Sequence, residues 1–267
     1  MSRYTLDDVS TDTAAPAPSA SSNGQADVPR TGWLAYHTAT RTATYGFLSV
    51  LPLFVLYEVM IVLVNSGSLS QVRISAEVWL KDVLRLVGAT NPLVLLGVVV
   101  AIGVGVFLWD RSRRIPLRMD YFLGLVAESA VYAVVVAFVA SGLVGMVFNA
   151  APQPAGDLWT QLALSIGAGL YEELLFRVLL VGGMALLLRP LLHDARYAYP
   201  IAAVVGALLF SAVHYIGPLG DPFLLSSFTF RFVFGLLLNG LFLWRGFGVA
   251  AWTHALYDVM LVVGLLG

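Results

Sequence analysis

The sequence predicts an all-α protein, a polytopic transmembrane helical bundle of about seven spans plus one interfacial amphipathic helix. Two observations carry this prediction. The chain of 267 residues is 59% hydrophobic and only 12% charged, whereas soluble domains are usually about 25% charged. Its apolar residues also gather in runs of roughly twenty, which is the length that an α-helix needs to cross a bilayer.

The composition excludes several functions. A formal net charge of −1 offers no basic field for nucleic acid. The chain has no cysteine, so disulfides, thiolate catalysis and cysteine metal ligands are all ruled out. Any metal site must therefore use histidine and carboxylate side chains.

The first 29 residues differ from the rest of the chain. They are rich in Ser, Ala, Pro, Thr and Asp and contain few large apolar residues, so they cannot bury enough surface to offset the entropy of ordering. We predict a disordered cytoplasmic tail over residues 1–29 and a transmembrane helical domain over residues 30–267. The tail lacks the pattern of a cleaved secretory signal, so we expect the first span to be an uncleaved anchor.

The spans are expected in the order in which the apolar runs occur. Between residues 70 and 87 the pattern changes, because charged residues recur there every four positions, at Arg73, Glu77, Lys81 and Arg85. This period predicts an amphipathic helix on the membrane surface. The spans themselves are predicted over residues 45–64, 92–109, 121–148, 158–188, 200–216, 223–243 and from 248 to the C-terminus.

The arginines predict the orientation. Arg111, Arg113, Arg114 and Arg118 lie in the short loop between the second and third spans. The positive-inside rule places this loop in the cytoplasm, and alternation then places the N-terminus there too. We expect an integral protein of a bacterial-type plasma membrane, with the lipid bilayer as its surroundings.

The fourth run, from Leu158 to Leu188, contains three charged residues, Glu172, Glu173 and Arg177. A charged side chain at the centre of a membrane helix costs about 2.5–3.5 kcal/mol. On an α-helix Glu173 and Arg177 share a face, whereas Glu172 lies about 100° away. The spacing predicts a structural ion pair between Glu173 and Arg177 and leaves Glu172 free to meet a substrate or a water.

Two later spans carry histidines with a partner one turn away. Phe210 precedes His214, so its ring can support the imidazole, and Asp258 follows His254 within reach of a hydrogen bond. A single histidine in a membrane helix often only bonds a neighbouring helix. One carboxylate and two histidines on three spans of so apolar a chain are less common. Outside this set, Glu58, Glu128 and Arg231 are expected to form structural pairs or lie at the interface.

The order of these polar residues resembles the motif set of the CPBP family, the CAAX-processing and bacteriocin-processing intramembrane proteases, which include the type II CAAX prenyl endopeptidases. The residues that carry the resemblance are Glu172, Glu173, Arg177, Phe210, His214, His254 and Asp258. The resemblance covers about residues 158–267, where we expect the catalytic core. The family commonly has asparagine at the position of Asp258.

The resemblance implies an intramembrane endopeptidase that hydrolyses peptide bonds of membrane-embedded or lipidated peptides. In this interpretation Glu172 and His214 activate a water, while His254 and Asp258 orient or stabilise the oxyanion. A desolvated oxyanion donor is worth more than one in water. An ionised Asp258 would only orient His254, and we expect all these side chains to converge.

Two questions stay open at this point. Glu172, His214 and His254 form a two-histidine, one-carboxylate set that suits zinc or another divalent metal, but no His-Glu-x-x-His motif occurs, and a metal-free mechanism uses the same residues. The alternative function is that of a non-proteolytic membrane protein, a bacteriocin-type immunity or scaffold factor. A small-solute transporter is less favoured, since no pair of broken helices repeats in the sequence.

Overall fold

The computed structural model describes residues 32–66, 73–86, 88, 92–113, 115–145, 157–217 and 220–266. In these residues every regular element is a helix and none is a strand, which confirms the all-α prediction. The tail predicted over residues 1–29 lies outside the described residues.

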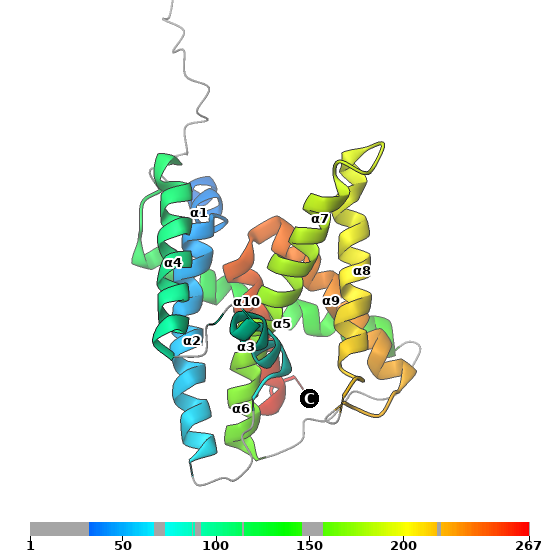
Figure 1. Cartoon of the computed structure of the whole chain (residues 1–267). Coiled ribbons are helices and arrows are strands. Elements are labelled where there is room, and N and C mark those ends of the chain that lie inside the picture. Colours follow the sequence, from blue (N-terminus) through cyan, green and yellow to red (C-terminus); the bar gives the residue numbers. More distant parts are fainter. Residues whose placement is uncertain are drawn as a thin grey trace, which may run out of the picture.

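The described helices follow the predicted order (Figure 1). The α-helices are α1 (Gly32–Thr40), α2 (Ala43–Asn65), α3 (Ser75–Leu86), α4 (Pro92–Asp110), α5 (Met119–Gly145), α6 (Leu158–Gly167), α7 (Gly183–Leu188), α8 (Ala198–Val213), α9 (Leu225–Arg245) and α10 (Phe247–Val262). A π-helix, η2 (Ala168–Gly182), and two 3-10 turns, η1 (Arg111–Arg113) and η3 (Ala195–Tyr197), complete the set.

Four helices in the described part of the chain, α2, α5, α8 with its preceding turn and α9, are long and apolar enough to cross a membrane. Helix α4 is uncharged up to Trp109, and α10 is a shorter apolar helix. The segments α6, η2 and α7 run on without a break, because Ala168 and Gly183 at the junctions keep right-handed helical backbone angles. The count of seven spans stays a prediction.

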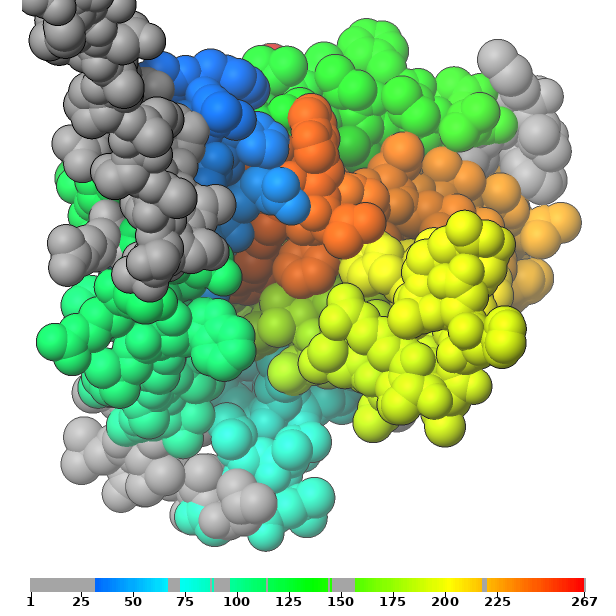
Figure 2. All heavy atoms as spheres, turned by 90° about the horizontal axis from the view of Figure 1, so that it is seen from above, coloured from blue at the N-terminus to red at the C-terminus, as the bar shows by residue number. Residues whose placement is uncertain are grey.

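Helix α10 lies at the centre of the bundle, where it packs against α2, α5, α6, α9 and η2. Such close surroundings require small side chains, and Gly248, Ala250, Ala251 and Ala255 of α10 are all buried. Helices α4 and α8 lie on opposite sides of the molecule in both views (Figures 1 and 2). The central position of α10 brings its polar residues against the helix that carries the glutamates.

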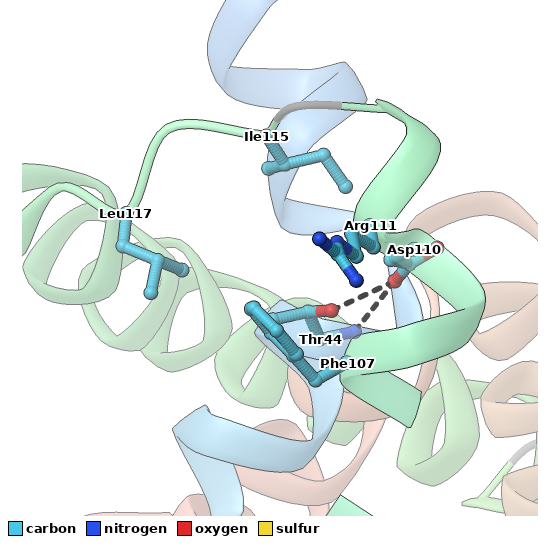
Figure 3. A pocket seen from close by; sticks show the side chains of 6 residues that line it. All are labelled: Thr44, Phe107, Asp110, Arg111, Ile115 and Leu117. Atoms are coloured by element: carbon cyan, nitrogen blue, oxygen red, sulfur yellow. Dashed lines mark hydrogen bonds between the residues drawn. The ribbon is translucent and has the colours of Figure 1, made fainter. Parts of the chain in front are cut away.

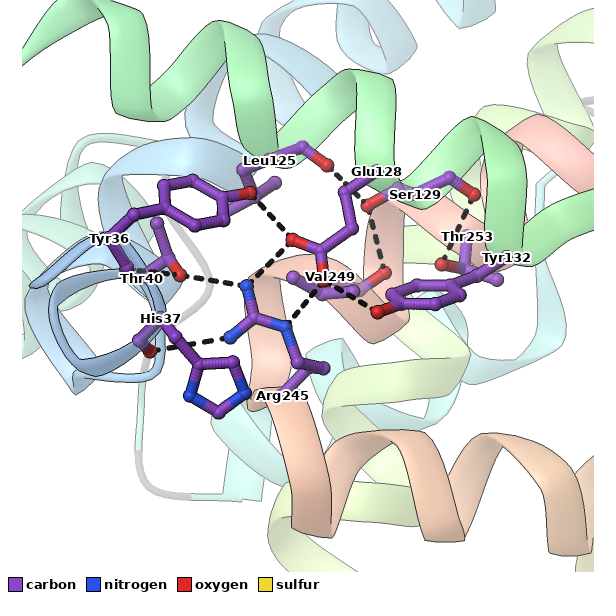
Figure 4. Close-up of polar contacts among 10 residues, drawn as sticks. All are labelled: Tyr36, His37, Thr40, Leu125, Glu128, Ser129, Tyr132, Arg245, Val249 and Thr253. Carbon is purple, nitrogen blue, oxygen red and sulfur yellow. Dashed lines mark hydrogen bonds and ion pairs between the residues drawn. The ribbon is translucent and has the colours of Figure 1, made fainter. Parts of the chain in front are cut away.

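Helix α1, which the sequence did not predict, is attached to the bundle through a buried arginine (Figure 4). Arg245 donates from Nε and Nη2 to the two carboxylate oxygens of Glu128, at 2.6 and 2.7 Å, and from Nη1 to the backbone carbonyl of His37. The hydroxyl of Tyr36 donates to Glu128 at 2.6 Å, and burial together with this bond raises the pKa of Tyr36. Glu128 therefore has the structural role that was expected of it.

Helix α3 is amphipathic, as predicted, but the part of its charged side around Glu77 faces the protein, whereas Arg85 and Asp82 are exposed. Glu77 is fully buried and accepts hydrogen bonds from Tyr57 of α2, from Lys81 and, at 2.5 Å, from Arg73. On the other side of the helix Leu86 is 88% exposed. The charges thus hold α3 against the bundle, and its apolar side is the one left for the lipid.

Candidate active site

The fourth apolar run holds its charged residues within the π-helix η2. A π-helix closes its hydrogen bonds over five residues instead of four, and such segments occur often at functional sites. Glu173 and Arg177, which the spacing paired in the sequence, are both fully buried, and Glu173 Oε1 lies 3.0 Å from Arg177 Nη1. Each charge offsets part of the cost of burying the other, and the guanidinium nitrogens of Arg177 make no hydrogen bond to any described residue.

Glu173 has a second partner that the sequence did not reveal. Its Oε1 also lies 2.7 Å from Nδ1 of His254 on α10. The two helices approach closely here because η2 has a glycine at the contact. A Cβ atom on Gly169 would lie 2.5 Å from Cβ and 2.6 Å from the backbone nitrogen of Ala255, the residue after His254. Glu173 is therefore shared between an arginine of its own helix and a histidine of the next.

Both ring nitrogens of His254 face carboxylates. While Nδ1 faces Glu173, Nε2 lies 3.5 Å from Oδ2 of Asp258, and the imidazole is only 3% exposed. An ionised carboxylate only accepts hydrogen bonds, so this arrangement suits a ring with hydrogen on both nitrogens. With Arg177 included, the two positive and two negative charges of the group then cancel.

Phe210 connects this charged group to the second histidine. The guanidinium carbon of Arg177 lies 4.5 Å from the centre of the Phe210 ring, a distance typical of a cation–π contact. The same ring stands edge to face with His214, with 5.0 Å between the ring centres. Phe210 is 3% exposed, so this buried ring contacts both polar groups.

His214 keeps one ring nitrogen free. It follows the last residue of α8, and its Nδ1 lies 2.7 Å from the backbone carbonyl oxygen of Phe210. Because a carbonyl only accepts, we assign the hydrogen to Nδ1, and the neutral ring then presents a lone pair at Nε2. The imidazole is half-buried, so Nε2 suits a proton acceptor or a metal ligand.

Glu172 is the acidic residue without a fixed partner. It is half-buried, and no hydrogen bond or ion pair links it to any other described residue. The neighbouring Glu173 is committed to Arg177 and His254. The structure thus joins Glu173, Arg177, His254 and Asp258 in one group and leaves the carboxylate of Glu172 available.

The proposed metal ligands do not assemble in this structure. Across the described ranges, no three histidine, aspartate or glutamate side chains lie where they could hold a metal ion. His254 in particular has a carboxylate at each nitrogen, whereas a metal ligand needs one nitrogen free. Glu172, His214 and His254 therefore do not fit a metal in this arrangement. Metal dependence stays a prediction.

One aromatic residue of the site was missed. The Phe234 ring of α9 lies 5.1 Å from the His254 ring, centre to centre, in an edge-to-face arrangement. Phe234 is 4% exposed and so closes the site on the side of α9. The sequence offers no signal for it, because Phe228, Phe230 and Phe232 precede it at alternate positions of the same helix.

These features define a class of protein, a helical membrane protein with a buried group of carboxylates, arginine and histidine in its late helices. Residues 153–260 match the family model described as Rce1-like, type II CAAX prenyl endopeptidase. This part of the chain is similar to that family, and the family resemblance predicted from the motifs is confirmed. No curated protein and no solved structure matches the chain significantly. The matched residues include the whole group from Glu172 to Asp258.

The family and the apolar helices together make this an integral membrane protein. Its residues 153–260 are similar to proteases of the CAAX type.

Proposed function

We propose that this chain is an intramembrane endopeptidase that hydrolyses peptide bonds of membrane-embedded or lipidated peptides. The family supports an endopeptidase of the CAAX type in general. The observation that supports the specific mechanism is that some polar side chains of the site have fixed partners and others do not. Glu173 and His254 are tied to each other, whereas Glu172 and the Nε2 atom of His214 have no fixed partner among the described residues.

The free groups suit the activation of water. In the proposed first step a water donates one hydrogen bond to Nε2 of His214, which orients it, and its other proton passes to the carboxylate of Glu172. The water oxygen forms a bond to the carbonyl carbon of the substrate, and the C=O double bond becomes a C–O⁻ single bond. General base catalysis of this kind contributes about 10²–10⁴-fold to the rate.

The tied groups suit the stabilisation of the oxyanion. Nε2–H of His254 donates toward the developing negative charge, and the long 3.5 Å distance to Asp258 leaves room for the substrate oxygen to compete. Glu173 stabilises the positive ring from its other nitrogen. Donors in a site that excludes water are worth more than in solution. The proton on Glu172 then passes to the amide nitrogen, the C–N bond breaks, and an acid and an amine are released.

The test replaces Glu172 with glutamine. We expect Glu172→Gln to lower peptide cleavage by about 10²-fold or more and to leave the thermal midpoint unchanged, because Glu172 has no fixed partner to lose. The protein is purified, reconstituted into liposomes and incubated with a library of peptides, both plain and prenylated. Cleavage by the Glu172→Gln variant at the wild-type rate would contradict the mechanism.

Two further arms complete the experiment. A chelator is added to the wild-type protein, and inhibition that added zinc reverses would show a metal requirement. Absence of cleavage by the wild-type protein for every peptide would favour the alternative of a non-proteolytic immunity or scaffold factor. We also propose that the N-terminus and the arginine-rich loop lie in the cytoplasm, as the positive-inside rule predicts.

A further inference from the structure

His214 lies just beyond the last residue of α8, where the regular hydrogen bonds of the helix end. Its backbone nitrogen donates to the carbonyl of Ser211 over a long 3.4 Å. The carbonyl of Phe210, which a continued α-helix would offer to that nitrogen, lies 2.7 Å from Nδ1 of the imidazole instead. The position of the His214 backbone therefore depends on contacts from outside α8.

Asp221 provides one of these contacts. Its backbone nitrogen donates to the backbone carbonyl of His214 at 2.8 Å, and its carboxylate accepts from Nη2 of Arg231 on α9. The side chain of Asp221 is 52% exposed, whereas that of Arg231 is only 16% exposed. The arginine is thus the more enclosed member of the pair, and it holds the residue that bonds to His214.

Arg231 also holds the residue that follows His214. Its Nη1 donates to the hydroxyls of Tyr215 and Ser227, at 2.9 Å each, and its guanidinium carbon lies 5.3 Å from the centre of the Tyr215 ring. A guanidinium can serve several partners at once, because its donors point in fixed directions. One side chain of α9 therefore anchors His214 through Tyr215 and through Asp221.

The contacts of Arg231 differ from those of the other arginines. Each other arginine–aspartate pair among the described residues joins positions two or three apart. Asp110, which pairs with Arg113, lines a cavity of about 230 Å³ where α2 begins and α4 ends (Figure 3). Arg231 instead reaches Asp221 and Tyr215 across ten and sixteen positions. It thereby ties α9 to the end of α8, whereas a local pair acts within its own turn.

We propose that Arg231 is a positioning residue for His214. This inference rests on the proposed function, in which Nε2 of His214 orients the attacking water. Arg231 acts through Asp221 and Tyr215 on the backbone of His214 and so determines where Nε2 points. A displacement of about 1 Å can cost about 10²-fold in rate, even when the substituted residue is far from the chemistry.

The first measurement is peptide cleavage by the full-length protein in liposomes, expressed per folded protein. Arg231→Met should lower kcat by about 10- to 10²-fold and change KM less, because it moves the water and not the bound peptide. In a His214→Ala background the same substitution should lower the residual rate no further, since the residue through which it acts is gone. A role in folding alone would lower both rates by the same factor.

A second variant and two matched controls accompany Arg231→Met. Tyr215→Phe removes one hydroxyl and keeps the ring, so it replaces Arg231→Met in every measurement if that variant does not fold. Arg196 makes the same kinds of contact at the opposite end of α8, because it pairs with Asp194, donates to the hydroxyl of Tyr197 at 2.9 Å and lies 4.8 Å from the centre of that ring. Arg196→Met and Tyr197→Phe should cleave as the wild type does.

The second measurement does not require cleavage. Diethyl pyrocarbonate acylates imidazole nitrogens that carry a lone pair, and mass spectrometry gives the labelling of His214 relative to that of His37 on α1. We expect this ratio to rise in Arg231→Met, because the half-buried ring of His214 is no longer held in place. The ratio should not change in Arg196→Met.

Four results would overturn the proposal. They are a wild-type kcat in both Arg231→Met and Tyr215→Phe, the same fold loss with and without His214, an equal loss in Arg196→Met, and an unchanged labelling ratio. If the wild-type protein cleaves no peptide, the proposed function fails, and the labelling ratio still decides whether Arg231 anchors His214.

Discussion

Replacing Glu173 with glutamine removes one negative charge from the centre of the bundle and keeps the shape of the side chain. The amide oxygen of glutamine can still accept the hydrogen bond from His254, which is 2.7 Å long with Glu173. What is lost is the charge that faces Arg177 at 3.0 Å. Since Arg177 is fully buried and its guanidinium nitrogens have no hydrogen-bond partner within the described residues, its charge would be left uncompensated.

Breaking a buried ion pair from one side typically costs about 3–5 kcal/mol. We therefore expect Glu173→Gln to lower the free energy of unfolding by about that amount. The double variant with Arg177→Met removes both charges, so it should be more stable than the single variant by about 1 kcal/mol or more, since uncharged replacements of a buried pair are often tolerated. With the Arg177→Met single variant added, the double-mutant cycle gives the coupling free energy between the two residues.

The assay is equilibrium unfolding in mixed micelles, with loss of helical circular dichroism as the signal. Glu172→Gln is the matched control, because it makes the same chemical change one residue away at a half-buried side chain with no fixed partner. Equal destabilisation by the two variants would refute the assigned roles. So would a double variant that is no more stable than Glu173→Gln.

Two further substitutions test how the helices are held. Gly169→Ala should destabilise the protein by about 1–3 kcal/mol through overpacking, because the new Cβ meets the backbone of Ala255. The control Gly183→Ala should not destabilise it, because a Cβ at that position meets no other atom within 4 Å. Equal thermal midpoints of the two variants would contradict this prediction. Glu128→Gln should expose α1 to limited proteolysis, since Arg245 would lose the carboxylate that positions it against that helix. An unchanged rate of cleavage between residues 32 and 40 would contradict this role of Glu128.

The orientation of α3 could not be predicted from its sequence pattern alone. The period of four in its charges was visible, and a helix forms there. A charged stripe, however, is compatible with two surroundings, water outside or opposite charges inside. Tyr57 of α2 donates to Glu77, and this contact from another helix turns the Glu77 part of the stripe inward.

The sequence by itself determined the all-α class of the protein and singled out the candidate site residues other than Phe234. Apolar runs of about twenty residues leave the backbone no stable choice in a membrane except a helix, and charged residues within such runs are too costly to occur without a role. These arguments are local, and so the run from Leu158 to Leu188, Glu172, Glu173 and the two histidines stood out directly.

Only the tertiary structure showed which of these residues contact one another. From the sequence, Glu173 needed no partner beyond Arg177, because the two opposite charges lie on one face of the same helix. The approach of η2 and α10 at Gly169 brings His254 within 2.7 Å of the same carboxylate oxygen. That contact depends on two segments eighty-one positions apart in the chain, and no periodicity along one helix contains it.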